Sequence, residues 1–318
     1  MNKRLFLLLR IAVSSVLILL LLYIMRDKYG QIAAVLKDTR LSTFGIAFLL
    51  FTTAVTIASL RLKLIIEAQG IPATFLEAVS LTFIGYFFNN FLPTAIGGDM
   101  VKAYYLSRKT HEKMGAVASI FVDRLIGLIT MIFMAFVALL LVDSEIMDPM
   151  VRYLIYAITL ASAAGLFFMA NKGFARRFSG ILSLVRPLEE KLRKAYNTVH
   201  KYRHRKALLA QSLFISVISQ IFFFFSLAML AASIGSYIPA KEIFLRMPIV
   251  SMLSLLPSIN GLGLREGATV VFFGPLIGKA NAFTVSILWL AVLLIVSIIG
   301  GIVYGLSPQF KMKMKDIK

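Results

Sequence analysis

The residues best placed to do chemistry are charged side chains that fall within long apolar stretches of the sequence. They are Asp99, Asp123, Arg124, Arg265 and Glu266, and Lys102 follows Asp99 by one turn on the same face of a predicted helix. A charge at membrane depth is costly and usually faces a cavity. These residues are therefore the first candidates for binding an ion, a proton or a charged headgroup.

The short helices that begin near Asp99 and Arg265 each follow a break rich in proline and glycine, and these prolines and glycines are the expected hinges. Unpaired backbone N–H groups at such a helix start favour an anion. Asp99 can cap its helix or bind a proton or cation, and asparagines in the breaks can hydrogen-bond a headgroup or satisfy freed backbone groups. The breaks contain Asn89, Asn90, Pro93, Gly97 and Gly98, and then Pro257, Asn260, Gly261 and Gly263.

Arg265 is the strongest candidate for contact with a headgroup, because an arginine beside a helix start can hold a phosphate by bidentate hydrogen bonds. The alternative is that Arg265 pairs with Asp123 or Asp99 and that Glu266 is only a first-turn charge. Asp123 and Arg124 lie about 14 Å into a predicted span, at about 1.5 Å per residue. Adjacent helix residues do not face each other, so each of these two needs a partner elsewhere.

The composition predicts a membrane protein, since 59% of the 318 residues are hydrophobic, against roughly 45–50% in soluble domains. In a soluble chain the net charge of +19 would suggest nucleic acid, but no nucleic-acid motif accompanies it. The absence of cysteine excludes disulfides and thiolate metal ligands. Enzyme signatures such as a G-x-S-x-G elbow or a P-loop are missing. We expect no catalytic residue, no cofactor and no metal.

Six apolar stretches have the length of about 20 residues that a helix needs to cross a bilayer. Two more, 78–109 and 247–278, contain the breaks, so they either span the bilayer or turn back inside it. Residues 172–206 form a basic amphipathic segment expected on the cytoplasmic leaflet, and docking of a partner or of anionic lipid there is an open alternative. The six predicted spans are 5–25, 41–60, 114–142, 152–171, 207–233 and 281–305.

The distribution of Lys and Arg decides between the two arrangements, because cytoplasmic loops carry an excess of these residues. If both interrupted segments turn back, 24 of the 34 Lys and Arg residues lie in cytoplasmic segments, 8 lie outside and 2 lie at membrane depth. If both span, the basic segment 172–206 faces outward. The sequence therefore predicts two re-entrant hairpins and places both termini in the cytoplasm.

The predicted order of two spans, one hairpin and one span occurs twice, in residues 1–150 and 151–318. The Leu-Pro pairs of the two breaks align, and each is followed by a glycine four residues after the proline. Because three spans per repeat is an odd number, the second repeat is inverted. Inverted repeats with broken helices are the architecture of many secondary transporters. The expected fold is an all-α polytopic membrane protein with six full spans and two re-entrant helical hairpins.

Three motifs taken together resemble the flippase-like membrane region of the lysylphosphatidylglycerol synthases, over about residues 5 to 305 of this chain. The resemblance implies a prokaryotic inner-membrane protein that moves a lipid with a charged headgroup between leaflets. Since the sequence ends at Lys318 without an aminoacyl-transferase domain, we expect a stand-alone member and do not assume a lysyl lipid. The motifs are Asn89-Asn90-Phe91-Leu92-Pro93 with Gly97-Gly98-Asp99, Asp123-Arg124-Leu125-Ile126-Gly127, and Gly261-Leu262-Gly263-Leu264-Arg265-Glu266.

The expected function is transport of a phospholipid, an aminoacyl-phospholipid or a polyprenyl-phosphate-linked lipid by alternating access. One alternative is a membrane enzyme in which Asp99 and Asp123 hold Mg²⁺ at a lipid phosphate, and another is a non-catalytic scaffold whose charges are locked in pairs. Membrane lipids are the expected partners, and a homo-oligomer or a cytoplasmic lipid-modifying enzyme is left open. The expected headgroup contacts are Arg265, Arg124, Asn89, Asn90, Asn260 and Lys102, and the expected proton-coupling or ion-pair residues are Asp99, Asp123 and Glu266.

Overall fold

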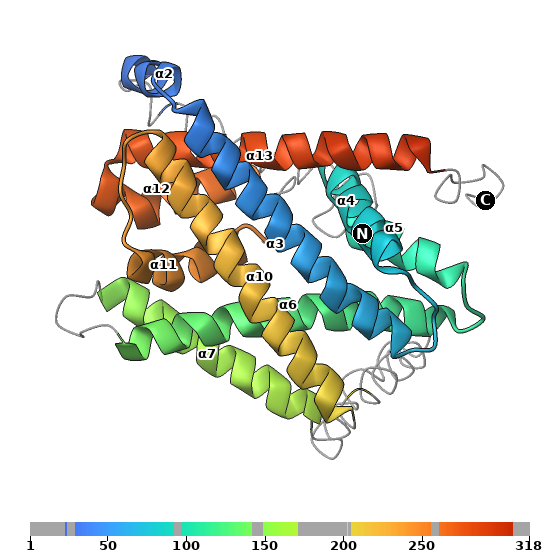
Figure 1. The fold of residues 1–318 in the computed structure, drawn as a ribbon. Coiled ribbons are helices and arrows are strands. Elements are labelled where there is room, and N and C mark those ends of the chain that lie inside the picture. Colours follow the sequence, from blue (N-terminus) through green and yellow to red (C-terminus); the bar gives the residue numbers. More distant parts are fainter. Residues whose placement is uncertain are drawn as a thin grey trace. The chain divides into compact units, whose positions relative to one another are not determined.

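The computed structural model describes residues 23, 29–91, 97–141, 149–170, 202, 205–255 and 261–307. Its regular structure is helical, with no strand in this part of the chain (Figure 1). The all-α prediction is therefore confirmed. The helices are α2 (Tyr29–Lys37), α3 (Leu41–Glu67), α4 (Phe75–Phe91), α5 (Gly97–Ser107), α6 (Lys113–Leu141), α7 (Pro149–Ala170), α10 (Lys206–Ser233), α11 (Ala240–Leu253), α12 (Leu264–Ile277) and α13 (Lys279–Leu306).

Four helices, α3, α6, α10 and α13, are long and apolar enough to cross a bilayer. They contain 27 to 29 residues each, where about 20 suffice. The apolar helix α7 adds a further 22 residues. These five helices overlap the predicted spans 41–60, 114–142, 207–233, 281–305 and 152–171, and α3 continues past its predicted span to Glu67. The predicted span 5–25, apart from Tyr23, and most of the segment 172–206 lie outside the described residues.

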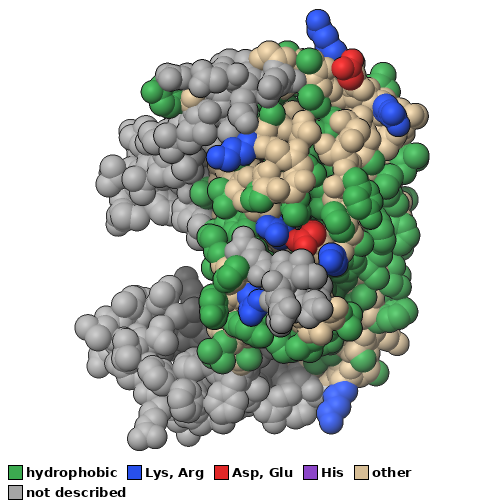
Figure 2. Space-filling view, turned by 90° about the vertical axis from the view of Figure 1, so that its left-hand side faces the viewer, with side chains coloured by type: hydrophobic (Ala, Val, Ile, Leu, Met, Phe, Trp, Pro, Cys, Tyr) green, Lys and Arg blue, Asp and Glu red, His purple; other side chains and the backbone are tan. Residues whose placement is uncertain are grey.

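The surface of the described helices is apolar, as a bilayer requires. Leu41, Leu141 and Leu306 each expose more than three quarters of their surface. Figure 2 shows hydrophobic side chains over much of the described surface in that view, with few charged groups among them. Apolar surface on this scale is exceptional for a protein in water. Together with the long apolar helices, it defines a multi-pass membrane protein.

The chain divides into two compact units, and each combines segments that are distant in the sequence. Unit 1 draws on Met1–Thr56, Val79–Lys102 and Ser219–Lys318, and unit 2 draws on Ile57–Ala78 and Ala103–Ile218. The division rests on packing, whereas the predicted repeats 1–150 and 151–318 rest on symmetry of the sequence. The inverted repeats therefore stay a prediction.

Within unit 1, α4 and α5 pack backbone against backbone. A Cβ atom built on Gly98 would lie 2.1 Å from the carbonyl oxygen of Gly85, so only glycine permits this approach. Asn89 Oδ1 accepts a hydrogen bond from the Gly98 N–H at 2.7 Å. On α13, a Cβ atom at Gly300 would lie 2.0 Å from the carbonyl oxygen of Phe83. Small residues are what allows apolar helices to approach so closely in lipid.

Within unit 2, the first residues of α4 are bound to the chain just after α5. Thr74 and Glu77 form a capping box, in which the Thr74 N–H donates to Glu77 Oε2 at 3.0 Å and the Glu77 N–H donates to Thr74 Oγ1 at 3.2 Å. Lys109 Nζ lies 2.5 Å from Glu77 Oε1. Burial raises the pKa of the Glu77 carboxyl, but the hydrogen bonds from Lys109 and Thr74 outweigh it and lower this pKa below its ordinary value.

Helix α11 begins at Ala240, well before the predicted segment 247–278. Arg246 lies just before that segment and is buried in the helix. Its Nε donates to Glu242 Oε2 at 2.8 Å and its Nη1 donates to the carbonyl oxygen of Phe272 in α12 at 2.7 Å. A charge that is paired and hydrogen-bonded can be buried in a packed helix. Helix α11 therefore extends beyond the N-terminal end of the predicted segment 247–278, whose re-entrant course stays a prediction.

We predict that Gly98→Ala destabilises the protein by about 1–3 kcal/mol, because the added methyl group must push α4 and α5 apart. The matched control is Gly45→Ala in α3, where a Cβ atom would meet nothing within 4 Å. This control change is expected to be neutral or to stabilise by up to about 1 kcal/mol. Thermal unfolding in detergent, followed by circular dichroism, measures both variants. Equal melting temperatures would contradict the close packing of the two helices.

Candidate functional site

The start of α12 is shaped by two glycines in the left-handed region of backbone space. Gly261 has φ +77° and Gly263 has φ +83°, a conformation that glycine adopts without strain. The turn directs the Gly263 N–H toward Glu266, whose Oε2 accepts a hydrogen bond from it at 2.7 Å. Glu266 thus satisfies one of the free N–H groups at the helix start.

Arg265 lies in the same first turn and is only 2% exposed. Its Nε donates to Glu266 Oε1 at 3.0 Å, and its Nη2 contacts the same oxygen. Arg265 Cζ lies 5.4 Å from the centre of the Trp289 ring in α13, which is a cation–π contact. The Arg265 guanidinium is therefore held between a carboxylate and an aromatic face inside unit 1.

The start of α5 carries a second ion pair. Lys102 Nζ lies 3.4 Å from Asp99 Oδ1, as expected for two residues one turn apart. The alkyl chain of Lys102 packs where a side chain on Gly85 would otherwise lie. The N–H group of Gly98 is bound by Asn89 from the neighbouring helix. Asn90 is half-buried in the last turn of α4.

In unit 2, Asp123 binds an arginine that the sequence did not single out. Arg61 Nε donates to Asp123 Oδ1 at 2.7 Å, and Arg61 Nη1 donates to Ser216 Oγ in α10 at 2.7 Å. A Cβ atom on Gly127 would lie 3.2 Å from Arg61 Nη1, so this glycine gives the guanidinium room. Asp123 does have a partner elsewhere, as predicted. Arg124 is half-buried on the same helix.

Arg61 was missed because the predicted span 41–60 ended at the first charge, while α3 continues to Glu67. The sequence does contain a signal for the longer helix, because Glu67 follows Lys63 by four residues, the spacing of a helix-stabilising pair. The structure forms this pair, with Lys63 Nζ 2.9 Å from Glu67 Oε1. That pair indicates that the helix extends past Arg61. Arg61 itself is 7% exposed and sits inside the bundle.

The ion pairs of Arg265 and Asp123 differ from the predicted alternatives, whereas Asp99 and Lys102 lie together as their spacing predicted. Arg265 was considered as a partner of Asp123 or Asp99, but the ion pairs formed are Arg265–Glu266, Asp123–Arg61 and Asp99–Lys102. Asp99 and Asp123, considered together for Mg²⁺, each bind a cationic side chain. No group of three or more potential metal ligands occurs in the described part of the chain. The candidates Pro93, Pro257 and Asn260 lie outside the described residues.

Long apolar helices that enclose ion pairs define the class as a multi-pass membrane protein, and sequence comparison defines the family. Residues 7–301 match the profile of the lysylphosphatidylglycerol synthase TM region, and the chain belongs to this family. This confirms the resemblance seen in the three motifs. A UPF0104 membrane protein of Methanocaldococcus jannaschii is 27% identical over 274 residues, 79% of this chain and 79% of that protein. A UPF0104 membrane protein of Methanothermobacter thermautotrophicus is 26% identical over 306 residues, 86% of this chain and 84% of its own.

We predict strong coupling between Arg61 and Asp123. Asp123→Leu alone leaves the guanidinium buried without its counter-charge, at an expected cost of about 3–5 kcal/mol. The double variant Arg61→Met/Asp123→Leu removes both charges and is expected to be more stable than either single variant. Unfolding midpoints of the three proteins, measured in detergent, give the coupling.

The matched control is the same cycle on the more exposed pair Lys63–Glu67, with Lys63→Met and Glu67→Leu. Its coupling is expected to be about 0.5 kcal/mol or less. If the two cycles gave equal coupling, the Arg61–Asp123 pair would not be the buried link that the distances indicate.

Proposed function

We propose that this protein moves a lipid with a charged headgroup between the leaflets of a prokaryotic inner membrane, and that Arg265 and Trp289 contact the headgroup. One observation carries the proposal. Trp289 Nε1 is buried beside Arg265 and has no hydrogen-bond partner among the described residues. A buried donor left unsatisfied costs about 1–3 kcal/mol. A phosphate oxygen would satisfy it and would pair with the guanidinium at the same time.

In this proposal Arg265 has two alternative partners, Glu266 and a lipid phosphate. In the structure the carboxylate holds the guanidinium; a lipid phosphate that reaches Arg265 competes for the same N–H groups. Glu266 keeps its bond to the Gly263 N–H through its other oxygen and can take up a proton once released from Arg265. Two alternative partners for one arginine, exchanged by ligand binding, are a two-state element of the kind that transport requires.

The proposed topology has six full spans and two re-entrant hairpins in inverted repeats. Helices α4, α5, α11 and α12 have 17, 11, 14 and 14 residues, fewer than the about 20 needed to cross. Their shortness supports hairpins that return to the side from which they enter, and rocking of the hairpins would give alternating access.

The other candidates keep their proposed roles. We propose Arg124, Lys102, Asn89, Asn90 and Asn260 as further contacts of the headgroup. Asp99 and Asp123 are proposed for proton coupling or ion pairing. The family description refers to a synthase of an aminoacylated phospholipid, which supports a lipid as the substrate.

A non-catalytic scaffold is the second candidate function, and a specific observation favours it. The side chains of Asp99, Asp123, Arg265 and Glu266 all have ion-pair partners in the structure. A scaffold needs nothing more than such pairs. It does not account for the unsatisfied Trp289 N–H, and it predicts that the purified protein moves no lipid.

We predict that Arg265→Lys and Trp289→Phe both slow lipid translocation. Lysine keeps the charge but lacks the planar fork, and phenylalanine keeps the ring but lacks the N–H. The expected reductions are about tenfold for Arg265→Lys and about threefold for Trp289→Phe, from the usual strengths of charged and neutral hydrogen bonds. The assay is dithionite quenching of a fluorescent phosphatidylglycerol analogue in proteoliposomes.

Lys279→Gln is the matched control, because Lys279 is an exposed cation at the start of α13 in the same unit. Its rate is expected to equal that of the unchanged protein. Unchanged rates for folded Arg265→Lys and Trp289→Phe proteins would refute the site. No translocation by the unchanged protein with any of the three proposed lipid classes would favour the scaffold.

We predict that the two ends of each hairpin label from the same side of the membrane. The chain contains no cysteine, so an introduced cysteine is the only thiol. Leu76→Cys and His111→Cys should react with an impermeant maleimide from the cytoplasm, and Tyr237→Cys and Lys279→Cys from outside. Labelling in spheroplasts and in inverted vesicles distinguishes the sides. Labelling of a hairpin's two ends from opposite sides would show that this segment spans.

A further inference from the structure

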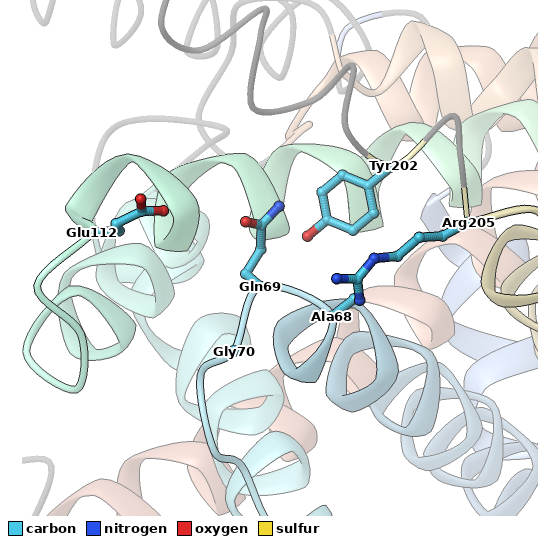
Figure 3. A pocket seen from close by; sticks show the side chains of 6 residues that line it. All are labelled: Ala68, Gln69, Gly70, Glu112, Tyr202 and Arg205. Atoms are coloured by element: carbon cyan, nitrogen blue, oxygen red, sulfur yellow. The ribbon is translucent and has the colours of Figure 1, made fainter.

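Unit 2 contains a pocket of about 320 Å³ where α3 ends and α6 begins. This volume is within the range of about 300–1,000 Å³ typical of small-ligand sites. Figure 3 shows the lining side chains, which come from the end of α3, from the turn before α6 and from the chain just before α10. They are Ala68, Gln69, Gly70, Glu112, Tyr202 and Arg205.

Two opposite charges line this pocket without meeting. Glu112 and Arg205 lie at its two ends, with Gln69 and Tyr202 between them (Figure 3). Neither charged group has an ion-pair partner among the residues that the structure describes. A ligand with separated negative and positive groups would complement both at once.

The wall between the two charges is fixed and neutral. The Tyr202 hydroxyl donates to the carbonyl oxygen of Ile65 at 2.9 Å and lies 3.2 Å from Ser119 Oγ. The Tyr202 ring packs in a buried cluster with Ile65, Val122 and Ile126. Burial raises the pKa of this phenol above its ordinary value, so it adds no charge of its own. The pocket therefore presents an exposed cation and an exposed anion beside a fixed and neutral wall.

The pocket lies at the ends of two helices that are long enough to cross a bilayer. Helix α3 ends at Glu67 and α6 begins at Lys113. The ends of such helices reach the level of the lipid headgroups, because the hydrocarbon core needs only about 20 residues. A ligand at this level is more simply part of a lipid than a soluble molecule.

We propose that this pocket binds the zwitterionic headgroup of a phospholipid, with Arg205 on the phosphate and Glu112 on the ammonium group. The planar fork of Arg205 matches two phosphate oxygens, and the amide of Gln69 can hydrogen-bond the remaining oxygens. The site uses none of the residues assigned to transport and does not depend on that assignment.

The test uses the full chain in nanodiscs of phosphatidylglycerol and isothermal titration calorimetry with two soluble probes. O-phosphoethanolamine carries both charges, and glycerol 1-phosphate carries only the phosphate. The first probe is expected to bind about fivefold more tightly, the effect of one exposed ion pair. Glu112→Gln should abolish this preference, and Arg205→Gln should weaken binding of both probes about fivefold or more.

Asp38→Asn and Lys241→Gln, which change exposed charges in unit 1, are the matched controls and should alter neither affinity. Equal affinity of the unchanged protein for both probes, or unaltered binding by Arg205→Gln, would overturn the zwitterion site. A second set of nanodiscs contains phosphatidylethanolamine, whose headgroup should displace O-phosphoethanolamine and weaken its apparent affinity. Undiminished binding there would overturn the assignment to a lipid.

Discussion

The cost of removing a charge from water is the constraint on which the described structure depends. Each deeply buried cation meets a carboxylate, as Arg61 does with Asp123, Arg246 with Glu242 and Arg265 with Glu266. An isolated charge in apolar surroundings would be far too costly, and pairing with added hydrogen bonds is what makes burial tolerable. The local backbone follows from this need, since glycines lie where a guanidinium or a helix must come close.

The three buried pairs are not equivalent. Arg61 and Arg246 each extend a second hydrogen bond to another helix, to Ser216 Oγ and to the carbonyl oxygen of Phe272. These two arginines join helices, and this structural role explains why they are buried. Arg265 donates to Glu266, its immediate neighbour in the chain, and faces a Trp289 ring whose N–H is unsatisfied among the described residues. The Arg265–Glu266 ion pair joins adjacent residues, and the contact of Arg265 with a second helix is the cation–π contact with Trp289 in α13. The proposed exchange of Glu266 for a ligand would account for the burial of this pair.

The sequence was sufficient to locate five long helices and insufficient to identify the ion-pair partners. Hydropathy and length predicted α3, α6, α7, α10 and α13 because each buries its own backbone hydrogen bonds and presents apolar side chains. Hydropathy favours ending a span at a charge, so the predicted span 41–60 stops before Arg61 and the predicted segment 247–278 begins after Arg246, although both arginines lie within helices. Pairing depends on which helices become neighbours, a property of the tertiary fold. The rule that adjacent residues do not face each other failed for Arg265 and Glu266, whose long side chains meet in the first turn of α12.

The geometry also explains why charged motifs of this chain include glycine. In the segment from Asp123 to Gly127, the aspartate binds Arg61 and the glycine one turn later leaves space for its guanidinium. At the second break, Gly263 turns its N–H toward one oxygen of Glu266 while the other oxygen holds Arg265. A single carboxylate therefore joins the backbone of the break to the proposed headgroup site. In the proposed mechanism, a ligand that draws Arg265 away from Glu266 would alter the support of that turn and would thereby couple headgroup binding to movement of the proposed hairpin.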